Sequence, residues 1–143
     1  MSDLRLGASL LKDGYSVAIV KEGRVLAVER GPGVKPLITA ALKAGHDIGG
    51  SCLADKVVGV AVAHLVLYFG IDAVYGKTGS KEALEVLARE NRVYVIDEVV
   101  PYIMNRSRDG RCPIETLACE SSSPKETYER LCQMFGITRP WTG

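Results

Sequence analysis

The stretch LADKVVGVAVAHLVLYF, residues 53–69, decides the fold, because the longest apolar run of the chain lies within it. Apolar side chains would surround a helix drawn through this stretch. In a water-soluble protein, a helix that is apolar on every side is a buried one. We therefore expect one buried helix from Leu53 to Phe69, with the charged pair Asp55–Lys56 in its first turn. Gly59 is expected inside this helix, where close packing would explain a small residue.

Strands and helices alternate on both sides of this stretch. Before it, the pattern predicts a helix over residues 3–12, a β-hairpin with strands Tyr15 to Lys21 and Arg24 to Arg30, and a helix from Pro36 that ends at Gly45. After it come a strand from Ile71 to Gly76, a helix capped by Ser80, a strand from Val93 to Ile96, an irregular segment from Val99 to Glu115, and a last helix capped by Ser123. The β–α–β alternation implies parallel strands, so the fold class is α/β with helices layered on a mixed sheet.

Length and composition narrow the class of protein further. The chain has 143 residues, of which 47% are hydrophobic and 24% charged, so it can bury a core of its own. We expect residues 1–120 to form the main domain and residues 121–143 a C-terminal helical extension packed on it.

Charge and apolar patterning bear on partners and location. The net charge is +1 and aromatic residues make up 6%, which argues against nucleic acid as a partner. No apolar run reaches membrane-spanning length, and the N-terminus does not look like a secretory signal. We expect a cytoplasmic protein with no membrane partner, and a homodimer is left open.

The glycine-rich link before the predicted central helix suggests one half of a site. Backbone N–H groups of Gly49, Gly50 and Ser51 would be placed to bind an anion. A cation in a first helical turn opposes the helix dipole by about 0.3–1 kcal/mol, which hints that Lys56 faces a partner. Asp55 and Lys56 would then form the floor of a pocket. The alternative is that Lys56 pairs with a nearby carboxylate or extends into solvent.

The irregular segment between Val99 and Glu115 suggests the other half. Arg106, next to Asn105, is suited to clamp a carboxylate or a phosphate. Cys112 would become a nucleophile if the neighbouring arginines favour its thiolate. Glu115 would act as a general base or pair with Lys56. The alternative is a solvated basic loop around an inert thiol.

Other polar residues give weaker signals. Ser80 is most simply a helix cap, although a helix start beside a strand end can also bind a ligand. His64 is expected to be a hydrogen-bonded core residue. The four cysteines include no C-x-x-C pair, and a composite metal site built from His46, Cys52 and Cys112 stays an alternative. We expect no cofactor, with zinc or iron left open.

Three stretches together resemble a known family. The run ADKVVGVAVAHL (Ala54 to Leu65), the helix opening at Ser80, and VPYIMNR with CPIE (Val100 to Glu115) resemble an uncharacterised domain-of-unknown-function family placed with the cytidine deaminase-like folds. The resemblance covers roughly residues 15–115. It implies a three-layer α/β/α sandwich that begins with a helix and a β-hairpin.

The resemblance does not imply deamination. Zinc deaminases carry His/Cys-x-Glu at the start of one helix and Pro-Cys-x-x-Cys at the start of the next. The corresponding positions here look like Ala54-Asp55-Lys56 and Thr78-Gly79-Ser80-Lys81, which lack the histidine and cysteine ligands. Without three ligands there is no activated zinc hydroxide, so the resemblance implies the scaffold without its usual reaction.

Together these observations predict a pocket for a small anionic or nucleotide-like molecule, without catalytic zinc. The candidates for catalysis are Asp55, Lys56, Cys112 and Glu115, and those for ligand binding are Ser51, Ser80, Asn105 and Arg106. Whether the pocket is catalytic is left open. The alternatives are a non-catalytic interaction or sensor domain, and a cysteine-based redox or metal-binding protein.

Overall fold

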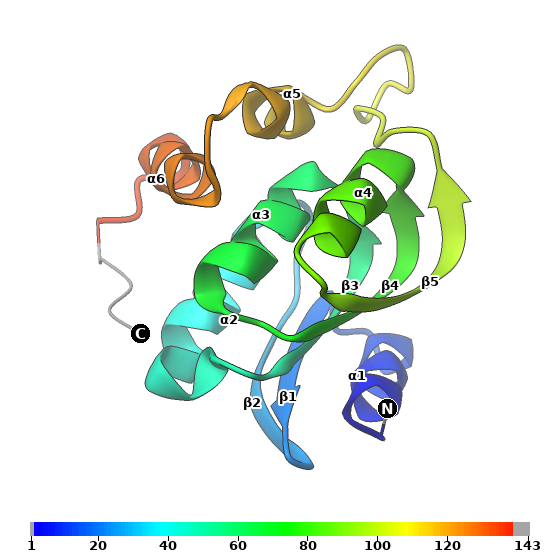
Figure 1. Cartoon of the computed structure of the whole chain (residues 1–143), viewed down its shortest axis with the longest axis vertical. Helices are drawn as coiled ribbons and strands as arrows, with labels where there is room; N and C mark the ends of the chain where they lie inside the picture. Colours follow the sequence, from blue (N-terminus) through cyan, green and yellow to red (C-terminus); the bar gives the residue numbers. More distant parts are fainter. Residues whose placement is uncertain (1, 139–143) are drawn as a thin grey trace.

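The computed structural model describes residues 2–138 and has a five-stranded mixed sheet at its centre (Figure 1). The strand order is β2-β1-β3-β4-β5. Strand β1 runs antiparallel to β2 and β3, while β3, β4 and β5 are parallel to one another. The predicted hairpin and the predicted parallel strands are thus both confirmed.

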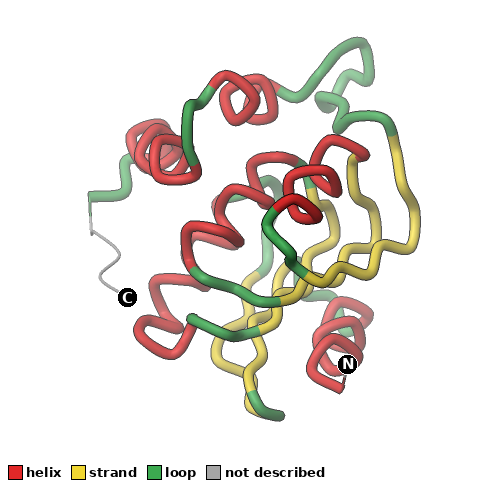
Figure 2. Tube along the Cα trace, viewed as in Figure 1, coloured by secondary structure: helices red, strands yellow, loops and turns green. Residues whose placement is uncertain are grey.

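Helices cover both faces of this sheet. In chain order the elements are α1 (Ser2–Lys12), β1 (Val17–Lys21), β2 (Arg24–Glu29), α2 (Lys35–Ala44), the short 3-10 helix η1 (Gly45–Ile48), β3 (Cys52–Val58), α3 (Val60–Phe69), β4 (Ala73–Ser80), α4 (Lys81–Arg89), β5 (Val93–Val100), α5 (Pro113–Glu120) and α6 (Pro124–Phe135). Helix α1 covers one face, and α2, α3 and α4 cover the other (Figures 1 and 2). The three-layer α/β/α expectation is confirmed. No helix in the described part of the chain is long and apolar enough to cross a membrane.

Each face of the sheet has its own hydrophobic core. The larger one packs α2, α3 and α4 onto the sheet, with Leu65 and Phe69 fully buried. Helix α6 contributes Tyr128 and Leu131 to the same core, and Tyr128 stacks on Tyr68 of α3 with ring centroids 4.7 Å apart. The C-terminal helix therefore packs against the main domain, while the division into residues 1–120 and 121–143 stays a prediction.

The predicted helix from Leu53 to Phe69 is wrong over its first half. Residues Cys52–Val58 form strand β3, and α3 begins only at Val60. Strand β3 lies in the middle of the sheet between β1 and β4. A central strand covered on both faces is apolar almost throughout, so its pattern merges with that of the buried helix that follows. Gly59 stands between the two, in extended conformation, as the residue before the helix.

This correction changes the setting of Asp55 and Lys56. Asp55 is the middle residue of strand β3 and Lys56 follows it, so the helix-dipole argument for Lys56 does not apply. Consecutive side chains in a strand point to opposite faces of the sheet. The two side chains are therefore expected to point in different directions.

The segment from Val99 to Glu115 is more ordered than the sequence indicated. Strand β5 continues to Val100, and Met104 forms an isolated antiparallel bridge with Arg111. Helix α5 begins at Pro113, inside the segment expected to be irregular. Proline suits the first turn of a helix, and that local signal was available in the sequence.

Gly76 of β4 leaves room for its neighbours in the larger core. A Cβ atom added there would lie 2.7 Å from Val58 Cγ2 and 2.8 Å from Ile96 Cδ1. We expect Gly76→Ala to lower the free energy of unfolding by about 1–3 kcal/mol, because a packed core resists an added methyl group. Urea denaturation checks this. The matched control is Gly49→Ala, where a Cβ would meet nothing within 4 Å. Equal stabilities of the two variants would contradict the prediction.

Candidate functional site

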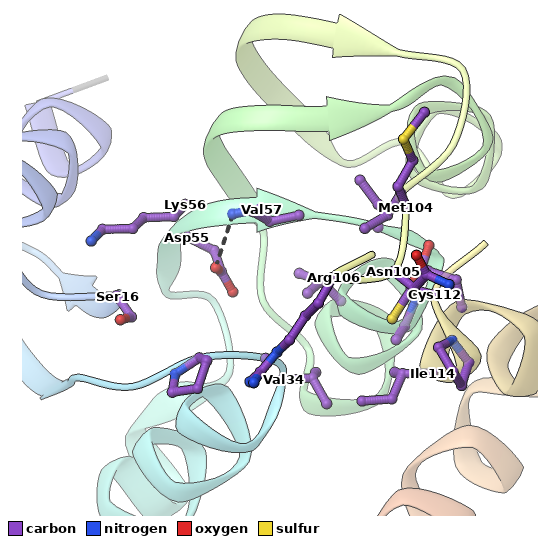
Figure 3. A pocket seen from close by; sticks show the side chains of 18 of the residues that line it. Ser16, Val34, Asp55, Lys56, Val57, Met104, Asn105, Arg106, Cys112 and Ile114 are labelled. Atoms are coloured by element: carbon purple, nitrogen blue, oxygen red, sulfur yellow. Dashed lines mark hydrogen bonds between the residues drawn. The ribbon is translucent and has the colours of Figure 1, made fainter. Parts of the chain in front are cut away.

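A cavity of about 710 Å³ opens at the carboxyl end of strand β3 (Figure 3). Segments far apart in sequence line it: residues 31–34 before α2, the chain from Asp55 to Val62, and the stretches 103–106 and 112–115. Open α/β sheets commonly bind ligands beyond the carboxyl ends of their strands.

The lining is largely apolar with a few polar groups. Its larger apolar side chains are Val34, Val57, Val62, Ile103, Met104 and Ile114, and its polar side chains are Ser16, Asp55, Lys56, Asn105, Arg106, Cys112 and Glu115. An apolar wall with a small number of polar groups is the usual make-up of a small-molecule site. Six of the eight residues predicted for the site thus border one cavity.

Asp55 lies on the floor of this cavity and is 5% exposed. Its Oδ1 accepts a hydrogen bond from the backbone N–H of Val57 at 3.2 Å. Its Oδ2 is buried and has no hydrogen-bond partner among residues 2–138. Burial raises the pKa of Asp55 to about 8, although the backbone N–H groups of Val57 and Lys56 act in the opposite direction. At neutral pH the group is therefore mostly a neutral carboxylic acid, which both donates and accepts.

Lys56 borders the same cavity but is exposed, and its ammonium group is directed away from Asp55 (Figure 3). Of the two residues expected on the floor, the structure brings only Asp55 there.

Glu115 is 4% exposed and is bound to the start of helix α3. Its Oε1 accepts from the backbone N–H of Val60 at 2.7 Å, and its Oε2 accepts from that of Ala61 at 3.1 Å. Gly59 precedes these residues and has no side chain to cap the helix, so Glu115 supplies the cap from α5.

This arrangement accounts for the burial of Glu115, because its carboxyl group is hydrogen-bonded where it is buried. Burial raises the pKa of its carboxyl group, and the two N–H groups oppose that shift. The suggested pairing with Lys56 is wrong, since the ion pairs among the described residues are Lys43–Glu29, Arg111–Glu82 and Arg130–Glu126. The sheer closeness of α5 to α3 also requires glycine at position 59, where a Cβ would lie 2.3 Å from Glu115 Oε1.

The loop between β5 and α5 supplies the remaining polar groups. The side-chain amide of Asn105 donates to Asp109 Oδ1 at 2.9 Å and its oxygen accepts from the Asp109 backbone N–H at 3.3 Å, so Asn105 closes the loop on itself. Arg106 extends into the cavity toward Val34 (Figure 3) and makes no hydrogen bond or ion pair with residues 2–138. Cys112 is half-buried, faces the cavity and precedes α5.

The two predicted serines lie elsewhere. Ser51 is buried before the amino end of β3, at the opposite end of that strand from the cavity. Ser80 is buried as the cap of α4, where its Oγ accepts from the backbone N–H of Ala83 at 3.1 Å. Neither lines the cavity. The capping role predicted for Ser80 is confirmed.

The histidines and cysteines do not assemble into a metal site. His64 Nδ1 lies 2.6 Å from Thr127 Oγ1 of α6, so the predicted hydrogen bond is present, although the side chain is only half-buried. Within residues 2–138, no three His, Cys, Asp or Glu side chains come together in a way that could hold a metal ion. His46, Cys52 and Cys112 are therefore not brought together.

Sequence reasoning missed the residues 31–34 and Gly59 as parts of the site. Gly31, Pro32 and Gly33 were informative only as the end of a strand. Gly59 was expected within a helix. A glycine-proline-glycine turn before a helix gives a local signal for a bend but none for the cavity that the bend borders.

A comparison with models of protein families assigns the chain to one of them. The model for TM1506, a domain of unknown function (DUF1893), matches residues 6–135. The chain belongs to the DUF1893 family. Consistent with this, the crystal structure of a DUF1893 family protein (TM1506) from Thermotoga maritima matches with a TM-score of 0.82 at 26% identity, over 94% of this chain and 92% of that one. A search of the curated proteins finds no match.

The fold of this DUF1893 chain is also similar to that of deaminases. A diaminohydroxyphosphoribosylaminopyrimidine deaminase/reductase from Thermotoga maritima matches with a TM-score of 0.50 at 18% identity, over 67% of this chain and 35% of that one. A dCMP deaminase from cyanophage S-TIM5, in complex with dCMP and dUMP, matches with a TM-score of 0.50 at 12% identity, over 66% of this chain and 93% of that one. These matches confirm the deaminase-like α/β fold.

The zinc of such deaminases does not fit the donors present here. The proposed correspondence of Ala54–Lys56 with a helix start is wrong, because these residues lie in β3. Among the described residues, three helices begin beside the cavity: α2, at Lys35, α3, at Val60, and α5, at Pro113. Among these starts, only that of α5 carries a possible zinc ligand, its N-cap Cys112. The first N–H groups of α3 are moreover occupied by Glu115. A single cysteine does not provide the three protein ligands of a catalytic zinc, and within residues 2–138 no such group of three comes together.

Proposed function

We propose that the cavity at the carboxyl end of β3 binds a small, partly apolar organic anion, such as a nucleotide-like molecule, without catalytic zinc. The observation that carries the proposal is the Oδ2 atom of Asp55, which is buried and has no partner within residues 2–138, in a side chain that borders the cavity. Leaving a buried polar group unpaired costs about 1–3 kcal/mol. A ligand that pairs with this oxygen explains why the chain keeps it.

Arg106 supports the anionic part of the proposal. Its guanidinium group is directed into the cavity and is not neutralised by any residue in the described range 2–138 (Figure 3). Guanidinium groups bind carboxylates and phosphates through paired, charge-assisted hydrogen bonds. The apolar walls would hold the carbon skeleton of the same molecule.

Of the four side chains suggested for catalysis, three stay candidates and one is weaker. Asp55, Cys112 and Glu115 face the cavity and stay the candidates for any reaction of the bound molecule. Glu115 already accepts two backbone hydrogen bonds, so it also stabilises the start of α3. Lys56 directs its ammonium group elsewhere and is the weakest candidate of the four (Figure 3).

Three of the four cysteines, all outside the cavity, give no support to the cysteine-based alternative. Burial raises the pKa of Cys52, Cys119 and Cys132, which disfavours their thiolates. An interaction domain and a homodimer stay predictions. The feature that bears on both is the edge strand β5, where Val93 and Val99 are exposed.

Titration with two simple organic anions, benzoate and phenyl phosphate, tests the proposed function. We expect saturable NMR shift changes confined to amides around the cavity. Arg106→Ala should weaken binding about five- to tenfold, the size expected for one charge-assisted contact. Arg5→Ala removes the same charge from an exposed position on α1, on the other face of the sheet, and should leave binding unchanged. Absence of saturable binding, or equal weakening by both variants, would overturn the proposal.

A further inference from the structure

Asp55 offers a ligand a specific pair of hydrogen-bonding atoms. Its Oδ1 already accepts from the N–H of Val57 and has a second lone pair left. Its Oδ2 has no partner within residues 2–138, so in the neutral acid it is the oxygen free to carry the proton. The side chain therefore presents an O–H donor and a carbonyl acceptor side by side.

Resting on the proposed function, we infer that the ligand faces Asp55 with a neutral edge in which an N–H donor and an acceptor atom are adjacent, as in a lactam, a primary amide or an amidine-type heterocycle. Such an edge satisfies both atoms of the neutral carboxyl group with two parallel hydrogen bonds. The anionic group of the same molecule then lies toward Arg106, which enters the cavity from a different wall (Figure 3).

The charges around Asp55 favour a neutral edge over a cationic group. Its partners on the neighbouring strands, Val17 of β1 and Gly76 of β4, carry no charge. The charged groups bordering the cavity are Lys56, which points away, Arg106, which would repel a cation, and Glu115, which is bound to the start of α3.

Burial rather than a neighbouring charge keeps Asp55 protonated. Cys112, the remaining titratable group on the cavity wall, adds no fixed positive charge. An ammonium ligand would find no preformed carboxylate at neutral pH, whereas a lactam would find its complement already in place.

Three probes with the same carboxylate end and different heads separate these cases. The first is 6-hydroxynicotinate, whose lactam form has the adjacent donor and acceptor. The second is its N-methylated lactam, which lacks the donor. The third is 4-(aminomethyl)benzoate, whose head is an ammonium group. Calorimetric titration of the full chain at pH 6 and pH 9 gives their affinities.

We expect 6-hydroxynicotinate to bind at least about tenfold more tightly than the N-methylated lactam at pH 6. Its affinity should fall about tenfold between pH 6 and pH 9, as the carboxyl group of Asp55 ionises. Asp55→Asn keeps a donor and an acceptor side by side, so it should retain the lactam probe within a few-fold and lose this pH dependence. Asp55→Ala should lose the preference for the lactam.

The outcomes distinguish the inference from the proposed function. Equal binding of the two lactams overturns the inference while the binding site itself stands. Tightest binding of 4-(aminomethyl)benzoate, increasing with pH and lost in Asp55→Asn, overturns it in favour of a cationic head. Failure of all three probes together with benzoate and phenyl phosphate overturns both.

Discussion

The Asp55→Asn variant is expected to be more stable than the native chain at pH 7, by about 2–4 kcal/mol. The folded state holds the Asp55 proton up to a pKa of about 8, whereas the unfolded chain releases it near the ordinary value of 3.8. Between pH 3.8 and about pH 8, the unfolded state therefore binds fewer protons than the folded state. The free energy of unfolding therefore falls as pH rises through this window, by about 1.4 kcal/mol per pH unit at most.

The same difference in proton binding determines how the free energy of unfolding depends on pH. The contribution of the protonated Asp55 to stability is fully present below about pH 4, and it is lost as pH rises to about 8. Asparagine does not ionise, so the advantage of the variant should be small at pH 4 and grow up to pH 8. Urea denaturation across this range measures the difference.

The control for this comparison is Asp13→Asn, which changes an exposed carboxyl group in the turn after α1. It should show no such growth with pH. A variant at Asp55 that is no more stable than the native chain at pH 7, or a difference that does not change with pH, would contradict the argument. A residue kept at a cost to stability is what a functional site predicts.

Glu115→Ala is expected to lower the free energy of unfolding by about 2–4 kcal/mol. The substitution leaves the backbone N–H groups of Val60 and Ala61 without their acceptor at the buried start of α3. Glu115→Gln should recover part of the loss, because its amide oxygen still accepts one of the two bonds. Glu120→Ala, an exposed carboxylate at the end of the same helix, is the control and should have little effect.

A double-mutant cycle with Gly59 tests whether the contact itself is responsible. A Cβ at position 59 would lie 2.3–2.5 Å from the carboxyl atoms of Glu115, so Gly59→Ala should displace that side chain and cost about 2–3 kcal/mol. In the Glu115→Ala background the same substitution should cost less than about 1 kcal/mol, because the clash and the cap are already gone. Additive losses in the two backgrounds would show that the two positions act independently.

Much of the fold could be predicted because its signals are local. The hairpin turn at Glu22–Gly23 and the caps at Ser80 and Ser123 each depend on a few neighbouring residues. The failure over residues 53–58 has a physical cause, since a central strand and a buried helix are both largely apolar, and the charged pair Asp55–Lys56 also suits a first helical turn. Sequence periodicity does not separate them when they are joined by a single glycine.

Six of the eight residues predicted for the site border the cavity, whereas the arrangement of their side chains could not be predicted from the sequence. Asp55, Arg106 and Cys112 stand out as polar residues near apolar segments, and they do border one cavity. The role of Glu115 depends on its hydrogen bonds with Val60 and Ala61, which precede it in the chain by 55 and 54 positions. No local sequence pattern encodes such a distant contact. Ser51 was assigned to the site only because β3 was expected to be a helix, which would have placed it at a helix start.

The most direct measurement of the central claim is the ionisation of Asp55 itself, followed through its side-chain Cγ resonance by NMR from pH 3 to pH 10. The native chain should titrate with a midpoint of about 8, and saturating 6-hydroxynicotinate should raise that midpoint further, because the probe binds the neutral carboxyl group. A midpoint close to 3.8, or one that the bound probe leaves unchanged, would contradict the account of Asp55 as a buried acid kept for a ligand.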